Sequence, residues 1–481
     1  NTLIGANAAD KTTTGTNNTA VGSQSLGANT TGSQNVAMGD NALGANTTAD
    51  YNTALGTSTL QLNTTGTRNV ATGAFSLTAN TTGDGNVAMG YQALKSNTTA
   101  DNNTAIGDQA LEFNTTGSEN TAVGRLSLDA NTTGGDNVAL GNSALGANTT
   151  ASHNTAVGSA ALLANTTGES NVAVGSQCLD ANTTGLGNVA VGRQALDNNT
   201  TGSQNVAVGT NALDANTTAD SNTAVGTSAL RANTTGAQNT AVGQNALNAN
   251  TTGGTNTALG YRAMGGATVT GNTNVAIGSD TLYVMTSGAN NTAVGYDAGG
   301  SVTSGANNAF FGKSSGLAGS PGGAITAGSN EVVVGNGDVS KANIQVDWTV
   351  ASDARDKTDF TALDLGLDFV KALAPVTYKW DKRSKYGNKK ADDYDLNAQT
   401  PDGTHKEDWL DIGFKAQEVE ALEIAAGYDK DNKTNLISSH TGDGKQMGLQ
   451  YSKFVPILVK AIQEQNALIE ALTTRITTLE G

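Results

Sequence analysis

The chain has 481 residues, of which 60 are glycine, 4% are aromatic and 14% are charged, so an aromatic-rich core cannot run through all of it. Its net charge of −16 argues against a nucleic-acid-binding surface, because phosphate contacts need clustered Lys and Arg. No apolar run approaches the roughly 20 residues needed to span a bilayer, and no signal peptide opens the chain. A lone cysteine, Cys178, rules out an intrachain disulfide framework.

A 17-residue repeat organises the first part of the chain. Its consensus is Asn-Val-Ala-Val-Gly-x-x-Ala-Leu-x-Ala-Asn-Thr-Thr-Gly-x-x, and sixteen terminal glycines from Gly5 to Gly260 keep a strict spacing of 17. Three looser copies end at Gly278, Gly295 and Gly312. Because the chain opens inside a repeat, we expect that an N-terminal part is missing. A period of 17 is too short for a pair of packed helices, so each unit is interpreted as one coil of a β-solenoid.

Each repeat position, numbered from its first Asn, has an expected role. Positions 1–5 alternate and are rich in β-branched residues, which predicts a short strand. A second short strand is expected around Ala42-Leu43, and Asn46-Thr47-Thr48 reads as a turn. The aliphatic position 4 and Leu at position 9 are expected to point inward as a thin core. The Asn at position 1 is expected to hydrogen-bond along the rod.

Several side chains of the repeat are candidates for other functions. Cys178 replaces a small residue at position 8 and is interpreted as structural. Exposed variable residues could contact a carbohydrate or a receptor, and five were singled out: Arg68, Asp84, Tyr91, Phe113 and His153. An ice-binding array is disfavoured because the threonines abut a glycine turn. The Asn-Thr-Thr sequons are better explained by turn chemistry than by glycosylation.

The composition changes sharply towards the C-terminus. Residues 341–481 hold 18 of the 26 Lys and Arg, 23 of the 42 Asp and Glu, and all three tryptophans. We therefore divide the chain into a regular shaft (1–260), irregular repeats with a neck (261–350), and a C-terminal domain (351–481). In this last domain we expect a helix over 363–373, a strand over 376–380 and a helix after Phe414. The polar stretches 381–408 and 426–447 are expected to project as arms.

The final segment carries an unbroken heptad pattern, which predicts a coiled-coil helix over about 452–480. The seam residues are Val455, Leu458, Ile462, Gln465, Ile469, Leu472, Ile476 and Leu479. Chains are therefore expected to associate through it, although sequence rules alone leave the number of chains open. A narrow repetitive coil also favours oligomerisation, because it buries little apolar surface and can slip by a whole repeat.

Two resemblances follow from these patterns. The Asn-x-Ala-x-Gly repeat over about 1–312 resembles the head repeats of trimeric bacterial adhesins and the shafts of phage tail fibres. Residues 345–481 resemble the C-terminal intramolecular chaperone of phage tailspikes and tail fibres, of the endosialidase type. Four motifs carry this second resemblance: Trp348-x-Val350-x-Ser352-Asp353-x-Arg355-x-Lys357, Tyr378-Lys379-Trp380, Gly413-Phe414-x-Ala416-Gln417-Glu418-Val419, and Tyr451 leading into Ala461-Ile462-Gln463-Glu464-Gln465.

The chaperone resemblance implies a single-turnover serine autoprotease. It makes Ser352 the nucleophile and Lys357 its base, with the break beside Ser352, at Ser352–Asp353 or on the Ala351 side. Lysine can accept a proton only when uncharged, and a free lysine titrates near about 10.4, so Lys357 must be desolvated or lie beside another cation such as Arg355. Alternatively, Ser352 and Asp353 merely cap the following turn.

The resulting prediction is a mainly β, trimeric tail-fibre shaft followed by an α+β chaperone domain that aligns three chains and then cleaves itself. The expected partners are two further copies of the chain, a host-surface receptor (a glycan or an outer-membrane component) and a virion baseplate or tail reached through the missing N-terminal part. The protein would be assembled in the host cytoplasm and function on the virion tail. No nucleic acid, cofactor or metal is expected, since His153, His405 and His440 lack ligand spacing, and the stretch starting Asp429-x-Asp431-x-Lys433 departs from a calcium loop.

Two other functions were weighed. A bacterial trimeric surface adhesin is the main rival, and it would place the protein on the bacterial cell surface. A chain of that class is expected to end in membrane strands rather than in a soluble heptad helix. An independent protease acting on other proteins is disfavoured because no substrate-cleft motif accompanies the dyad.

Overall fold

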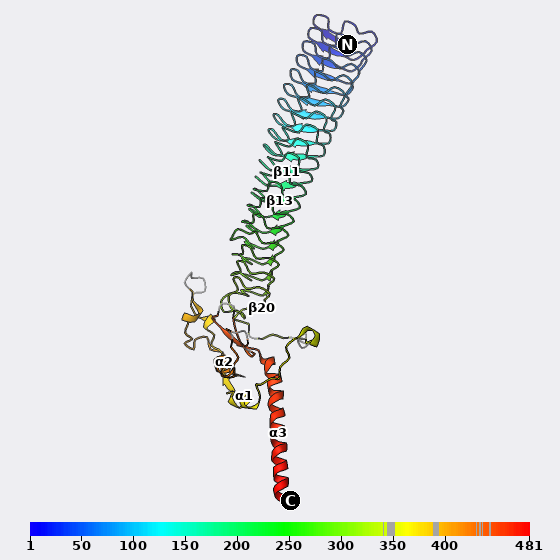
Figure 1. Cartoon of the computed structure of the whole chain (residues 1–481). Coiled ribbons are helices and arrows are strands. Elements are labelled where there is room, and N and C mark those ends of the chain that lie inside the picture. The colour runs from blue at the N-terminus through cyan, green and yellow to red at the C-terminus, as the bar shows by residue number, and fades with distance from the viewer. Residues whose placement is uncertain are drawn as a thin grey trace. The chain divides into compact units, whose positions relative to one another are not determined.

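The computed structural model describes residues 1–339, 341–343, 352–387, 394–429, 431, 434, 436–441 and 444–481. The chain forms two compact units, Asn1–Ala293 and Val294–Gly481, which are described separately. The first is a parallel β-solenoid, with one three-residue strand in each coil (Figure 1). The mainly β fold and the solenoid predicted from the repeat are thus confirmed.

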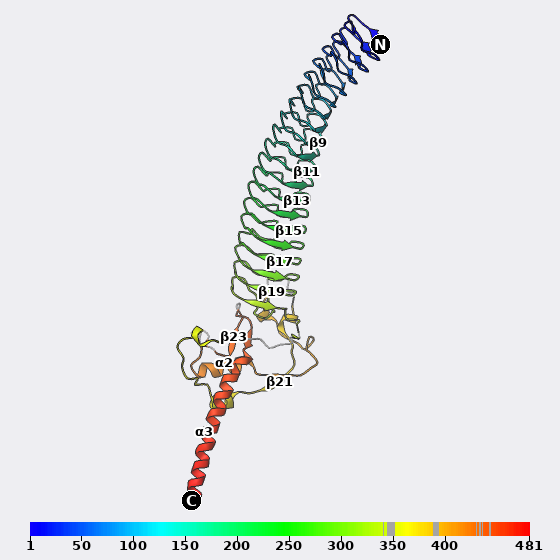
Figure 2. The ribbon, with the colours of Figure 1, turned by 90° about the vertical axis from the view of Figure 1, so that its right-hand side faces the viewer.

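The solenoid strands recur at the period of the repeat. They are β1 (Thr2–Ile4), β2 (Thr19–Val21), β3 (Val36–Met38), β4 (Thr53–Leu55), β5 (Val70–Thr72), β6 (Val87–Met89), β7 (Thr104–Ile106), β8 (Thr121–Val123), β9 (Val138–Leu140), β10 (Thr155–Val157), β11 (Val172–Val174), β12 (Val189–Val191), β13 (Val206–Val208), β14 (Thr223–Val225), β15 (Thr240–Val242), β16 (Thr257–Leu259), β17 (Val275–Ile277), β18 (Thr292–Val294), β19 (Ala309–Phe311) and β20 (Val332–Val334). Neighbours pair in parallel with equivalent residues opposite one another, as Ala37 lies opposite Ala54. Figure 2 shows the strands stacked in one column.

The expected second strand of each coil is wrong. Residues 40–45 form a turn, and Leu43 adopts a left-handed backbone with φ of 51°. This conformation costs roughly 1–2 kcal/mol for a residue with a Cβ. It is compensated because the turn places the Leu43 side chain inside the coil, where it is fully buried. The prediction that Leu at position 9 points inward is therefore confirmed, although its backbone is not extended.

The prediction for position 4 is also wrong, because its side chain points outward. Met38 and Met89 are 45% and 43% exposed, whereas Ala37 and Ala88 at position 3 are fully buried. Successive side chains of a strand face opposite sides, so the buried Asn at position 1 and Ala at position 3 force positions 2 and 4 outward. The coil interior is thus made of Ala, Leu and Asn, and the aliphatic residues of position 4 form a column on the outside.

Two buried columns of asparagine connect the coils. At position 1, the Asn18 Oδ1 accepts a hydrogen bond from the Asn35 backbone N at 2.9 Å, while the Asn35 Nδ2 donates to the Ala49 carbonyl at 2.8 Å. This confirms the predicted bonding along the rod. At position 12, the Asn46 Nδ2 donates to the Asn29 Oδ1 at 2.8 Å. These Asn side chains of the Asn-Thr-Thr sequons are buried, so the folded coil keeps them from a glycan.

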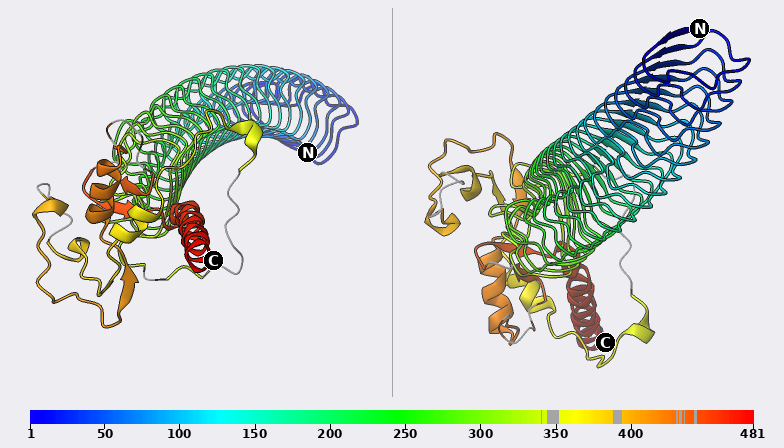
Figure 3. Two further views of the ribbon diagram at one scale, coloured as in Figure 1. Left: turned by 60° about the horizontal axis from the view of Figure 1, so that its bottom comes forward. Right: turned by 90° about the horizontal axis from the view of Figure 1, so that it is seen from above.

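The glycine at position 5 is required by two constraints. Gly22 has φ of +135°, a region that side chains with a Cβ rarely adopt, and a Cβ there would lie 2.5 Å from the Gly39 carbonyl oxygen of the next coil. The end-on views in Figure 3 show how closely the coils of Asn1–Ala293 stack. The conserved spacing of this glycine thus reflects backbone contact between coils.

In the second unit, the last rung is altered as the sequence indicated. Strand β20 pairs with β19, 23 residues earlier in the chain, through Phe310 opposite Val333. Phe310 replaces the usual Ala and is fully buried. Gly316 leaves room for it, because a Cβ at Gly316 would lie 2.5 Å from the Phe310 ring.

The C-terminal part combines short helices, two hairpins and one long helix. Its elements are η1 (Ala354–Asp356), α1 (Leu367–Ala372), β21 (Val376–Tyr378), η2 (Arg383–Lys385), η3 (Leu396–Ala398), β22 (Asp411–Gly413), α2 (Ala416–Ala425), β23 (Ser438–His440), β24 (Met447–Leu449), η4 (Tyr451–Lys453) and α3 (Phe454–Glu480). Strands β21 and β22 pair antiparallel, as do β23 and β24. A small core joins α1, α2, β23 and α3 and contains Leu365, Phe369, Val419, Ile437, Phe454 and Ile457.

The expectation that 381–408 and 426–447 are projecting arms is wrong for their described residues. Leu396 and Ile437 are fully buried, and β23 lies within the second stretch. Each stretch contributes a few apolar anchors that a window dominated by polar residues conceals. Hydrophilic composition therefore did not exclude these stretches from the core.

The close approach of the coils predicts the effect of Gly22→Ala. The variant should unfold at a clearly lower temperature, because backbone strain alone costs about 1–3 kcal/mol and the added Cβ overlaps the next coil. The matched control is Gly27→Ala in the same coil, where the nearest atom to a Cβ is 3.2 Å away and φ is not positive. Thermal unfolding followed by circular dichroism measures both, and equal midpoints for the two variants would contradict the assignment.

Candidate functional site

The candidate site lies on one 3-10 turn at the start of the C-terminal part. Helix η1 brings residues five apart together, so that the Lys357 Nζ donates to the Ser352 Oγ at 2.6 Å. The same nitrogen lies 3.5 Å from the Ser352 carbonyl oxygen, the carbonyl of the Ser352–Asp353 bond. The two residues singled out as nucleophile and base are thus in direct contact.

Asp353 and Arg355 hold this turn. The Asp353 side chain caps η1 by accepting from the Arg355 backbone N at 2.9 Å, and its carboxylate also binds the Arg355 guanidinium, with Nη2 to Oδ2 at 2.5 Å. The hydrogen bonds from Arg355 lower the pKa of Asp353 and keep it ionised. The capping role considered from the sequence therefore coexists with the Ser352–Lys357 contact. Arg355 is engaged by Asp353 instead of lying free beside Lys357.

The environment of this pair is open in one chain. Ser352, Arg355 and Lys357 are exposed, so the described residues of a single chain do not enclose the Lys357 amine. The Ala351 carbonyl, which is the alternative target of attack, lies outside the described residues, as do Trp348 and Val350 of the first motif. The contact supplies a nucleophile and a proton acceptor, but the desolvation must come from elsewhere.

The other resemblance motifs support the domain core. The Tyr451 Oη accepts from the Phe414 backbone N at 3.3 Å, and the Phe414 ring stacks on Phe454 with centroids 5.1 Å apart. A side chain at Gly413 would collide with Tyr451, which explains the glycine of the Gly-Phe motif. Tyr378 and Trp380 both donate to Asp411 on the neighbouring strand. These residues position the helices instead of taking part in chemistry.

One buried carboxylate was missed by sequence analysis. Glu423 is 1% exposed and accepts from the backbone N of Leu436, Ile437 and Ser438 at 2.7, 2.6 and 2.9 Å. It thereby fixes the chain entering β23 against α2. The available signal was its helical spacing of four from Val419, which places both on the buried face.

The eight predicted seam residues all lie on α3. The helix spans 27 residues and has two apolar faces. Phe454, Ile457 and Ala461 are buried within the domain, whereas the seam from Val455 to Leu479 is exposed, with Leu458 at 43% and Leu479 at 79%. The seam is therefore separate from the face that the domain uses for its own core.

The five candidate receptor-contact residues are exposed but dispersed. Arg68 and His153 occupy position 17, Asp84 position 16, Tyr91 position 6 and Phe113 position 11, each in a different coil. Asp84 accepts from the Thr67 backbone N at 2.6 Å and so links two coils. The structure does not gather these residues into one site.

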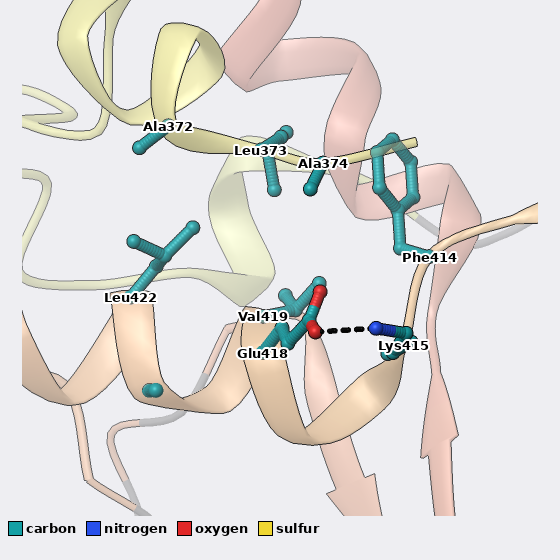
Figure 4. Close-up of a pocket in the computed structure, with 9 residues that line it drawn as sticks. Ala372, Leu373, Ala374, Phe414, Lys415, Glu418, Val419 and Leu422 are labelled. Carbon is teal, nitrogen blue, oxygen red and sulfur yellow. Dashed lines mark hydrogen bonds and ion pairs between the residues drawn. The ribbon is translucent and has the colours of Figure 1, made fainter. Parts of the chain in front are cut away.

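Other candidate chemistry is inert or apolar. Burial raises the pKa of the Cys178 thiol to about 12, so it stays protonated. A pocket of about 260 Å³ between the end of α1 and α2 is lined largely by apolar residues, with the Lys415–Glu418 pair at its rim (Figure 4). Among the described residues, no group of three or more His, Cys, Asp or Glu is placed to hold a metal ion. No helix in that part of the chain is long and apolar enough to cross a membrane.

Comparison with known proteins follows the same division of the chain. Residues 352–428 match the family model described as chaperone of endosialidase. No curated protein matches the chain. A β-solenoid combined with this domain fits a tail-fibre-like protein that carries an intramolecular chaperone. The family is also associated with autoproteolysis.

A column of aspartates crosses three successive coils at position 10 of the repeat. It consists of Asp180, Asp197 and Asp214, with Arg231 beside Asp214 in the following coil at 3.7 Å. Burial raises the pKa of Asp180 and of Asp197 above 3.8, and for Asp197 the charges of Asp180 and Asp214 raise it further, against a hydrogen bond from Gln194.

This column predicts that acidification stabilises the shaft locally. A raised carboxyl pKa means that the ionised form destabilises the folded state, and this penalty disappears as the pH falls through the folded pKa towards 3.8. Asp197→Asn should raise the unfolding temperature at pH 7 and flatten its rise between about pH 7 and 4. The control Glu119→Gln removes an exposed charge elsewhere on the shaft. A profile for Asp197→Asn as steep as that of the parent would contradict this account.

Proposed function

We propose that the protein is a homotrimeric fibre shaft for attachment to a host surface, whose C-terminal domain aligns three chains and then cleaves itself beside Ser352. The observation that carries the proposal is that one chain leaves an apolar stripe exposed in each part. One stripe is the position 4 column of the shaft, and the other is the seam of α3. Exposed apolar surface of this extent typically marks an interface.

Homotrimer formation would cover both stripes. The seam residues repeat at heptad spacing, which suits parallel helices of identical chains. The position 4 column repeats every 17 residues, so identical shafts can lie side by side in any register shifted by whole coils. The seam has a unique register and would remove that ambiguity. Three is the number of chains that the resemblance to tail fibres and adhesin heads implies.

Self-cleavage would then depend on assembly. Ser352 Oγ attacks a carbonyl carbon while Lys357 Nζ takes its proton, the peptide nitrogen leaves with a proton, and water releases the ester. Lys357 is exposed in one chain, so a neighbouring copy would have to supply the desolvation that leaves its amine uncharged. Attack by Ser352 on its own carbonyl needs a strained four-membered ring. The bond broken is therefore Ser352–Asp353 if another serine or chain attacks, and Ala351–Ser352 if Ser352 attacks the preceding carbonyl.

The rival proposal is a bacterial trimeric surface adhesin carrying the same domain. The repeat pattern fits it equally well, whereas the chaperone match favours the tail fibre. The tail fibre would act on the virion tail. In either case the shaft's exposed variable residues would contact the host or target surface, which for the tail fibre is a glycan or outer-membrane component.

The Ser352–Lys357 contact predicts that Ser352→Ala and Lys357→Met each abolish cleavage. The parent should give two fragments on a denaturing gel, and mass spectrometry of the new C-terminus should place the break at residue 351 or 352. Thr358→Ala is the matched control, since it removes a hydroxyl next to the turn and should cleave normally. Recovery of only full-length parent chain from a verified trimer would contradict self-cleavage.

The exposed seam predicts that Ile469→Asp combined with Leu472→Asp prevents both trimerisation and cleavage, because burying charges at a helix seam is strongly unfavourable. Light scattering should give a mass of three chains for the parent and a lower mass for this variant. Thr474→Asp, on the opposite side of α3 from the seam, is the control and should remain trimeric. A monomeric parent would exclude the trimer.

A further inference from the structure

The neck and the C-terminal domain touch across the proposed cleavage site. Both segments belong to Val294–Gly481. The Lys382 Nζ donates to the Gly337 carbonyl at 3.0 Å, and the Lys385 Nζ pairs with the Asp338 carboxylate at 3.0 Å. Gly337 and Asp338 precede Ser352, and the two lysines follow it. These contacts therefore join residues that a break beside Ser352 would place on different fragments.

Ser384, between the two lysines, fits closely against two neck glycines. It is 5% exposed. A Cβ at Gly337 would lie 2.8 Å from the Ser384 Oγ and 2.5 Å from the Gly319 carbonyl oxygen, and a Cβ at Gly319 would overlap Ser384. The approach is possible only because both neck residues lack side chains. We call the contact of 382–385 with Gly319, Gly337 and Asp338 the neck joint.

The 382–385 turn is held by the domain that follows Ser352. The Arg383 guanidinium donates to the Asn397 side chain at 2.8 Å and to the Lys445 carbonyl at 2.7 Å, and Lys445 pairs with Asp395 at 2.9 Å. The turn therefore belongs mechanically to the C-terminal domain. Its grip on the neck does not depend on the peptide bonds between 343 and 352.

We propose that the neck joint keeps the C-terminal domain docked on the shaft after the chain is cut, so that cleavage and release are separate steps. This inference rests on the proposed cleavage beside Ser352. The joint is small, because a cavity of about 590 Å³ lies beside it, lined in part by Gly319, Gly337, Lys382 and Trp409. The Lys385–Asp338 pair is a third to a half exposed, so salt screens it. Release should therefore be promoted by salt or by loss of the two lysines.

The test makes the break independently of self-cleavage. In the full chain carrying Ser352→Ala, residues 344–351 are replaced by the recognition sequence of a site-specific protease, and the protein is cut after its oligomeric state has been measured. Size exclusion at low salt should show both fragments eluting together, and a denaturing gel should show them separated. Retention should fall as salt is raised.

Two variants test which contacts hold the fragments. Lys382→Ala combined with Lys385→Ala should raise the dissociation rate roughly tenfold or more, because hydrogen bonds from charged groups are lost. Gly337→Val should also release the domain by displacing Ser384. Lys415→Ala, which breaks an ion pair within the domain at 2.7 Å, is the matched control and should retain it (Figure 4). Separation of the parent fragments at low salt, or parent-like retention by the double lysine variant, would overturn the proposal, whereas failure of self-cleavage alone would leave it standing.

Discussion

The buried asparagine side chains are the interaction on which the shaft depends. A coil of 17 residues is too narrow to satisfy its inward-pointing backbone groups with a second layer of structure, and an unpaired buried polar group costs about 1–3 kcal/mol. The Asn at position 1 solves this by accepting from one coil and donating to another, as the Asn18–Asn35 bond does. The bond needs the next coil to be identical at the same place. Faithful repetition is therefore a requirement of the hydrogen bonding as well as a result of it.

The same constraint determines what faces outward. With Asn and Ala inside, the larger aliphatic residues of position 4 are left on the surface, where one chain gives them little cover. The shaft thus solves its polar problem within each chain and leaves its apolar problem to be solved between chains. The α3 helix shows the same division, because Phe454, Ile457 and Ala461 serve the domain while the seam stays exposed. Assembly and folding are coupled in this view, and a domain that sets the register has a clear physical purpose.

The Ser352–Lys357 turn fits this coupling. Its geometry is local, since a single capped 3-10 turn brings the two side chains to 2.6 Å. Its chemistry is not local, because an exposed lysine needs further burial before it can act as a base. A turn that is formed in each chain but completed only by neighbours would tie cleavage to assembly. The neck joint adds a second stage, in which contacts across the break decide when the pieces part.

The sequence by itself determined the features that depend on periodicity and local chemistry: the coil length, the inward Leu at position 9, the stacking of the first Asn, the heptad helix, and the turn that carries Ser352 and Lys357. It also contained the correct orientation of position 4, since buried residues at positions 1 and 3 leave it no other face. Tertiary structure decided what pattern could not. Leu43 adopts a left-handed turn because burial outweighs its backbone strain, Ile437 and Leu396 enter the core from polar stretches, and Ser384 meets Gly319 and Gly337 across distant parts of the chain. These outcomes depend on which surfaces meet in three dimensions, and a one-dimensional pattern does not record that.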